Sequence, residues 1–88
     1  MNSRQLEYFL AVAHELNFTK AAKAMYVSQT AVTQQIKALE EQLGVSLFER
    51  TKKKVVLTPA GKVFLKEASS ILKRIDTAIE RTSEASSG

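Results

Sequence analysis

Hydrophobic positions recur at helical spacing in the first segment of the chain, from residue 3 to residue 16. Its charged residues Arg4, Glu7 and Glu15 fall away from the apolar face. This pattern predicts one amphipathic helix. The apolar face consists of Leu6, Phe9, Leu10, Ala13 and Leu16.

Two more helices are predicted on either side of a short turn. Asn17 is a suitable N-cap for a short helix whose small side chains, Ala21 and Ala22, permit close approach of a neighbouring helix. Ser28 is a natural N-cap for a third helix, which Gly44 ends. We expect Tyr26 to pack at the turn between them. The inward stripe of the third helix is Ala31, Val32, Ile36, Leu39 and Leu43. Two helices joined in this way indicate a helix-turn-helix.

The pattern changes to short β-compatible runs between residues 45 and 57. The runs SLFER and VVLT are separated by the basic stretch TKKK, which predicts a small hairpin with a lysine tip. Because this tip contains no glycine, a two-residue turn is disfavoured and a connection of four residues or a looser one is expected. We assign Phe48 to the core.

A long helix is predicted from Pro59 to about Thr82, with Thr58 as its N-cap. Roughly 24 residues at a rise of 1.5 Å give a length of about 36 Å, more than three short helices can cover. Its apolar stripe therefore needs a second surface, most simply a copy of itself. The residues assigned to dimerisation are Phe64, Leu65, Ala68, Ile71, Leu72, Ile75, Ala78 and Ile79. We expect residues 83–88 to form a flexible polar tail.

Composition narrows the range of functions. The 88 residues suffice for one small domain. There is no cysteine and only one histidine, His14, which we assign to the surface, so we expect no metal site and no cofactor. No pair of side chains forms a catalytic constellation, and an enzyme is not predicted. The absence of a long apolar run or a signal-peptide pattern favours a cytoplasmic protein without a membrane partner.

The positive charge is concentrated in the middle of the chain. Residues 18–66 contain nine lysines or arginines and three glutamates, whereas the segments before and after are slightly acidic. A basic centre of this kind indicates a polyanionic partner.

Uncharged hydrogen-bonding residues occupy the front of the third helix. An α-helix fits the major groove of B-DNA, where glutamine pairs with adenine and threonine offers a hydroxyl and a methyl group. We therefore predict that this helix reads bases through Gln29, Thr30, Thr33 and Gln34. Residues expected to contact phosphates are Thr19, Lys20, Ser28, Lys37 and Arg50.

Other interpretations remain open at this point. Polar side chains on an exposed helix are often only solvated. The long helix could instead be the functional surface of a helical protein–protein interaction module, with the basic region serving solubility. Recognition of RNA is a third possibility, although the deep A-form major groove suits this helix poorly.

The sequence resembles the N-terminal DNA-binding domain of LysR-type transcriptional regulators. The resemblance covers residues 3 to about 80 and is carried by LEYFLAVAHELNFTKAAKAMYVSQTAVTQQIKALEEQLGVSLFERTKKKVVLTPAG. It implies a mainly α fold, in which a winged helix-turn-helix of three helices and a β-hairpin wing (1–58) precedes a linker helix (59–82) through which two chains dimerise. It also implies double-stranded DNA as the partner, a partly palindromic operator, and a small-molecule effector bound only by a C-terminal domain that this chain lacks.

The resemblance also assigns residues. It places base reading on Gln29, Thr30, Thr33 and Gln34, with Ala31 able to touch a thymine methyl group, and it places the wing at Lys52, Lys53 and Lys54. The family commonly has proline at position 30, arginine at position 34 and a glycine near position 52. The absence of that arginine removes a side chain that commonly reads guanine, and Gln34 favours adenine instead. Consecutive lysines suit point-charge contact with phosphates.

Overall fold

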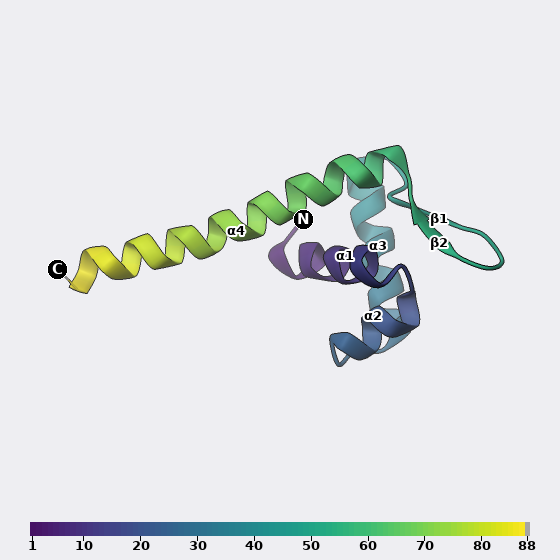
Figure 1. Cartoon of the computed structure of the whole chain (residues 1–88), viewed down its shortest axis with the longest axis horizontal. Helices are drawn as coiled ribbons and strands as arrows, with labels where there is room; N and C mark the ends of the chain where they lie inside the picture. Colours follow the sequence, from purple (N-terminus) through teal and green to yellow (C-terminus); the bar gives the residue numbers. More distant parts are fainter. Residues whose placement is uncertain (88) are drawn as a thin grey trace.

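The computed structural model describes residues 1–87 and contains four helices and one hairpin. In chain order these are α1 (Ser3–Glu15), α2 (Phe18–Ala24), α3 (Gln29–Leu43), β1 (Phe48–Arg50), β2 (Val55–Leu57) and α4 (Pro59–Ser87). Figure 1 shows α1, α2 and α3 gathered at one end of the molecule, with the hairpin on one side and α4 extending away from them on the other. The expected mainly α winged helix-turn-helix with a long C-terminal helix is confirmed.

Local hydrogen bonds set the helix boundaries. The side-chain oxygen of Asn17 accepts from the backbone amide of Lys20 at 2.8 Å, and that of Ser28 accepts from Ala31 at 3.0 Å. Each satisfies a backbone donor that has no partner within its own helix. Gly44 ends α3 in the left-handed conformation, with φ of 74°. The predicted caps of the second and third helices are confirmed.

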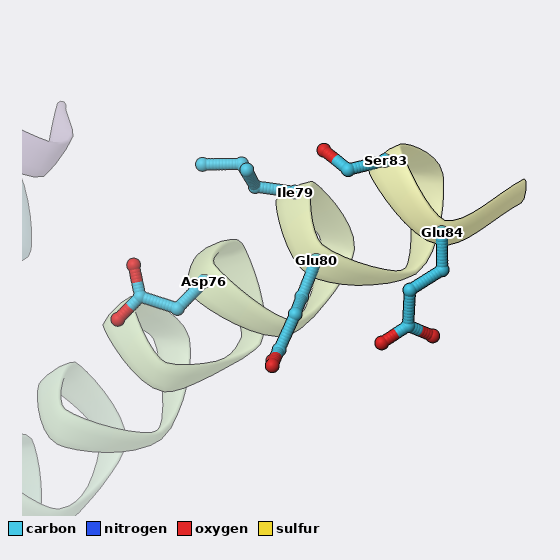
Figure 2. A pocket seen from close by; sticks show the side chains of 5 residues that line it. All are labelled: Asp76, Ile79, Glu80, Ser83 and Glu84. Carbon is cyan, nitrogen blue, oxygen red and sulfur yellow. The ribbon is translucent and has the colours of Figure 1, made fainter. Parts of the chain in front are cut away.

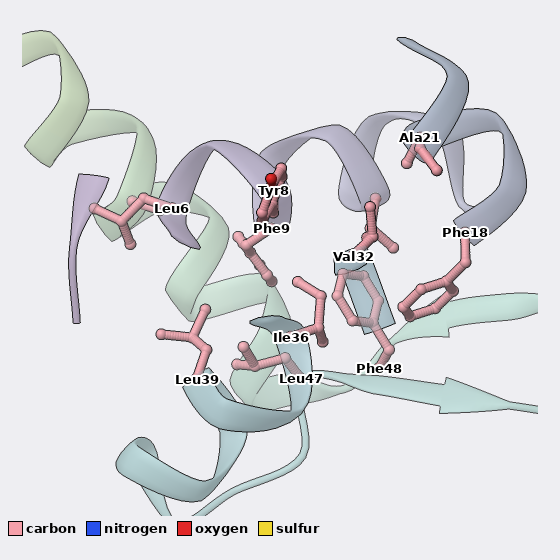
Figure 3. Close-up of a cluster of buried hydrophobic side chains, with 13 residues drawn as sticks. Leu6, Tyr8, Phe9, Phe18, Ala21, Val32, Ile36, Leu39, Leu47 and Phe48 are labelled. Atoms are coloured by element: carbon pink, nitrogen blue, oxygen red, sulfur yellow. The ribbon is translucent and has the colours of Figure 1, made fainter. Parts of the chain in front are cut away.

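An aromatic chain crosses the core and connects four elements. The ring of Phe9 in α1 lies 5.3 Å from that of Phe48 in β1 and 5.0 Å from that of Phe64 in α4, while Phe48 lies 5.9 Å from Phe18 in α2. Such tilted and edge-to-face pairs add to the stabilisation from burial. Figure 3 shows Phe9, Phe18 and Phe48 among the buried side chains between the helices and the hairpin. Phe64 is partly buried and packs against this cluster. The assignment of Phe48 to the core is confirmed.

The start of α4 is fixed against the segment that leads into β1. The Thr58 hydroxyl donates to the Ser46 carbonyl at 2.6 Å and accepts from the Gly61 amide at 2.9 Å, which confirms Thr58 as the N-cap. The Thr58 amide donates to the carbonyl of Leu47 at 3.0 Å. A Cβ atom at Gly61 would overlap that same carbonyl oxygen. Glycine therefore allows α4 to approach the Leu47 backbone.

Two expectations for the end of the chain need correction. The last helix continues to Ser87 rather than ending near Thr82, because residues 82–87 include no glycine or proline to stop it. The expected flexible tail is thus helical up to residue 87, and residue 88 lies outside the described part of the chain. Among the described residues, no helix combines the length and apolar character needed to cross a membrane.

The turn between α2 and α3 differs from the prediction for Tyr26. Its side chain is 95% exposed, so the expectation that it packs is wrong. The backbone at Tyr26 is left-handed, with φ of 58°, and this conformation directs the side chain away from the core. The turn is held instead by the amide of Val27, which donates to the Ala22 carbonyl at 3.0 Å.

Candidate nucleic-acid interface

The leading edge of α3 is polar and open to solvent. Gln29, Thr30 and Gln34 are exposed, while Ala31 and Thr33 are half-buried. The opposite face of the same helix is packed into the core through Val32, Ile36 and Leu39. Because the inward face is fixed by apolar burial, the polar residues are presented outward on a rigid element.

One side chain of this edge is held by a neighbour on α2. The hydroxyl of Thr19 donates to the amide oxygen of Gln29 at 2.9 Å, although the two residues are ten positions apart. The short helix-turn-helix connection brings the first turn of α2 beside the start of α3. Sequence reasoning assigned Thr19 to phosphate contact and gave no sign of this pair.

The wing, defined here as residues 48–57, is a two-stranded antiparallel hairpin. Phe48 pairs with Leu57, Glu49 with Val56, and Arg50 with Val55. The four-residue connection of residues 51–54 is closed by the Thr51 amide, which donates to the Lys54 carbonyl at 2.9 Å. This agrees with the expected four-residue connection. The tip lysines Lys52, Lys53 and Lys54 are all exposed.

A basic groove separates the wing from the helix-turn-helix. It has a volume of about 310 Å³ and includes Thr19 and Gln29 together with Arg50, Lys53 and Lys54. Its described lining contains these three cationic side chains and no carboxylate. Three positive charges around an open groove favour an anionic group such as a phosphate.

Arg50 is positioned by an aromatic ring. Its guanidinium carbon lies 3.8 Å from the centroid of the Phe18 ring, within the range of a cation–π interaction. A second groove, of about 280 Å³, shares Phe18 and Arg50 with the first and also includes Thr33 and Lys37. Arg50 thus lies between the two grooves, with its charge still exposed.

The residues assigned to dimerisation fall into two groups. Ala68 is fully buried within this chain, and Phe64, Leu65 and Leu72 pack against the same core. These four cannot all belong to a free dimer face, because the first half of α4 uses the stripe to cover α1. Ile71 and Ile75 are each 40% exposed, Ile79 is 62% exposed, and Ala78 is also exposed.

Comparison with known proteins identifies the family. The sequence model of a family described as "Bacterial regulatory helix-turn-helix protein, lysR family" matches residues 3–62. The chain belongs to the LysR family of bacterial regulatory helix-turn-helix proteins. It is 49% identical to the HTH-type transcriptional regulator TfdS of Cupriavidus pinatubonensis and 46% identical to AlsR of Bacillus subtilis, over all 88 residues in each case. The chain spans 30% of the length of TfdS and 29% of AlsR.

Solved structures from this LysR family share the complete fold. The structure of a CbnR_DBD-DNA complex superposes with a TM-score of 0.95 at 44% identity, covering 98% of this chain and 99% of that one. A BenM_DBD complex with catB site 1 DNA gives a TM-score of 0.93 at 40% identity, covering 100% and 98%. The similarity therefore extends through α4 as well as the helix-turn-helix.

The structure brings most of the predicted site residues onto neighbouring surfaces. The polar edge of α3 adjoins Thr19, and Arg50, Lys53 and Lys54 share a groove with it. Lys37 is exposed farther along α3, beside Thr33 and Arg50. Lys20 and Ser28 are exposed as well, with Ser28 also serving as the cap. His14 lies on the surface, as expected.

Proposed function

We propose that this chain binds double-stranded DNA sequence-specifically, as the DNA-binding part of a bacterial LysR-type transcriptional regulator. The observation that carries the proposal is the exposed polar edge of α3, which adjoins a groove lined by three cations on a fold shared with a DNA-binding complex. The three positive charges by themselves would suit any acidic partner. The amide and hydroxyl groups on the exposed edge of α3 are in addition suited to base edges.

In the proposed complex, α3 enters the major groove. Gln29, Thr30, Thr33 and Gln34 face base edges, and the methyl group of Ala31 is available to a thymine. The sugar-phosphate chain beside that groove passes between α3 and the wing, where Lys37 and Arg50 are exposed. Lysines 52–54 at the wing tip contact the phosphates of the adjacent minor groove.

We also propose a homodimer formed through α4. The α4 helix extends beyond the other helices, and its distal turns carry Ile75 and Ile79 on the surface. Figure 2 shows Ile79 pointing away from the side chains of Glu80 and Glu84 on these turns. An apolar row on a helix without neighbours in its own chain is stabilised by pairing with a second helix.

The charge distribution along α4 favours an antiparallel arrangement of the two copies. Residues 59–70 contain two lysines and one glutamate, whereas residues 76–87 contain three acidic residues and one arginine. Antiparallel pairing places the more basic start of one helix near the acidic end of the other. A two-fold dimer of this kind presents two copies of α3 to a partly palindromic site.

Selection of bound duplexes from a random pool, at a stated salt concentration, tests the proposal. A sequence-specific dimer should enrich a motif with two related half-sites centred one or more helical turns apart. Duplexes that are recovered without any shared motif would show that binding rests on charge alone. A pool of folded RNA should compete only weakly, because A-form helices do not admit α3.

A further inference from the structure

The contact between Thr19 and Gln29 joins the two helices of the helix-turn-helix through their side chains. The Thr19 hydroxyl donates to Gln29 Oε1 at 2.9 Å, and both side chains are exposed beside the basic groove. The backbone beneath the pair is well fixed, because Ala21 and Ala22 are buried and the Val27 amide bonds to the Ala22 carbonyl. The backbone positions that carry the two side chains are thus held close together.

This geometry limits what the Thr19 hydroxyl can do. A threonine hydroxyl has one hydrogen to donate, and Gln29 Oε1 accepts it. A phosphate oxygen offers only acceptors, so Thr19 cannot donate to a phosphate while the bond to Gln29 exists. Its hydroxyl is committed to the neighbouring side chain rather than to the DNA backbone.

The same bond defines the orientation of the Gln29 amide. Oε1 faces Thr19, and Nε2 retains both of its hydrogens for an external acceptor. Oε1 also keeps a second lone pair, since an amide oxygen accepts two hydrogen bonds. Adenine presents N7 as an acceptor and N6 as a donor in the major groove, and this pair matches the groups that Gln29 still offers.

We propose that Thr19 is a positioning residue that orients the Gln29 amide for base recognition. The inference rests on the proposed function, because it concerns how α3 reads DNA. A glutamine side chain has three rotatable bonds and loses conformational entropy when it binds a base. A partner that orders the amide beforehand reduces that loss and disfavours the flipped amide, so Thr19 contributes to specificity without touching the base.

A double-mutant cycle on one base pair tests the inference. The duplex selected by the wild-type chain is varied one base pair at a time, and Gln29→Ala identifies the position at which Gln29 discriminates. Thr19→Val removes the hydroxyl at nearly constant shape and should lower affinity for the selected duplex about two- to tenfold, as expected for one neutral hydrogen bond. The loss should be concentrated at the base pair that Gln29→Ala identifies.

Two controls separate positioning from other roles. Thr19→Ser keeps the hydroxyl donor that Thr19→Val removes. Its affinity and its discrimination at that base pair should therefore match those of the wild type. In the Gln29→Ala background, Thr19→Val should add no further loss. Thermal unfolding of each variant, followed by circular dichroism, excludes a loss that comes from misfolding.

Other results would overturn the inference. If Thr19→Val weakened binding equally on all duplexes, or added its full effect in the Gln29→Ala background, Thr19 would act independently of Gln29. If the wild-type chain selected no motif, the proposed function would fail first. That failure is visible without any Thr19 variant, so the two are distinguishable.

Discussion

The carboxylate of Glu40 accepts a hydrogen bond of 2.7 Å from the backbone amide of Leu47, the residue that leads into β1. The same oxygen accepts from the amide of Phe48 at 3.4 Å. Glu40 lies on α3, so these bonds fasten the base of the wing to the helix that carries the polar edge. In the proposed complex, this connection fixes the distance between the two DNA-contacting elements.

Loss of the Glu40 carboxylate should destabilise the fold. In Glu40→Ala the amide of the buried Leu47 loses its acceptor, and the free energy of unfolding should fall by about 1–3 kcal/mol. Glu40→Gln keeps one carbonyl acceptor and should retain part of that stability. Urea unfolding monitored by circular dichroism measures both. A Glu40→Ala variant as stable as the wild type would mean that this hydrogen bond makes no net contribution to the free energy of unfolding.

A methyl group at Gly61 should be destabilising even though alanine is the better helix former. Helix propensity alone favours Gly61→Ala by about 1 kcal/mol. The added Cβ would overlap the Leu47 carbonyl oxygen, so we expect a net loss of about 1–3 kcal/mol from overpacking. Ser70→Ala, at an exposed position of α4, is the matched control and should be neutral or slightly stabilising. A Gly61→Ala variant with a raised melting temperature would show that α4 does not approach the Leu47 carbonyl closely at this position.

The sequence predicted the elements better than the contacts between them. Asn17, Ser28, Gly44 and Thr58 were identified as caps because a cap depends on residues within one turn of the chain. Tyr26 was misassigned because the packing preference of an aromatic ring was weighed without the left-handed backbone at the turn.

Pairs that form between elements carry no local signal. The bonds from Thr19 to Gln29 and from Leu47 to Glu40 depend on how the elements meet in space. The stripe on α4 was found by its periodicity, but periodicity cannot separate Ala68, which is buried in this chain, from Ile75, which is exposed. Only the arrangement of α1 beside α4 makes that distinction.

Neutralising the wing tip should reduce the salt dependence of DNA binding. If Lys52, Lys53 and Lys54 contact phosphates, replacing them with glutamine should flatten the slope of log K against log salt by about 0.9 for each phosphate that the wing no longer neutralises. Lys73→Gln removes one lysine charge from α4, away from the wing, and should leave the slope nearly unchanged. Titrations across a salt series measure this directly. An unaltered slope in the wing variants would place the wing outside the interface.

A charge on the distal face of α4 should disrupt the proposed dimer. Ile75→Asp places a carboxylate where an apolar contact is expected, which should shift sedimentation toward the monomer. Binding to a duplex with two half-sites should weaken at least about tenfold, since burial of an unpaired charge costs several kcal/mol. Ser70→Asp adds the same charge at another exposed position of α4 and should remain dimeric. If Ile75→Asp sedimented as the wild type does, the dimer face would have to lie elsewhere.

The central claim is that the polar edge of α3 reads bases, and comparison of specific with non-specific affinity tests it most directly. Dissociation constants of the wild type, Gln29→Ala and Gln34→Ala are measured at one salt concentration on the selected duplex and on a scrambled duplex of equal length. We predict that each substitution weakens binding to the selected duplex by roughly 5- to 150-fold, the range for removal of a base-reading side chain worth about 1–3 kcal/mol, and leaves binding to the scrambled duplex unchanged. Equal losses on both duplexes, or no loss on either, would contradict base reading by this helix.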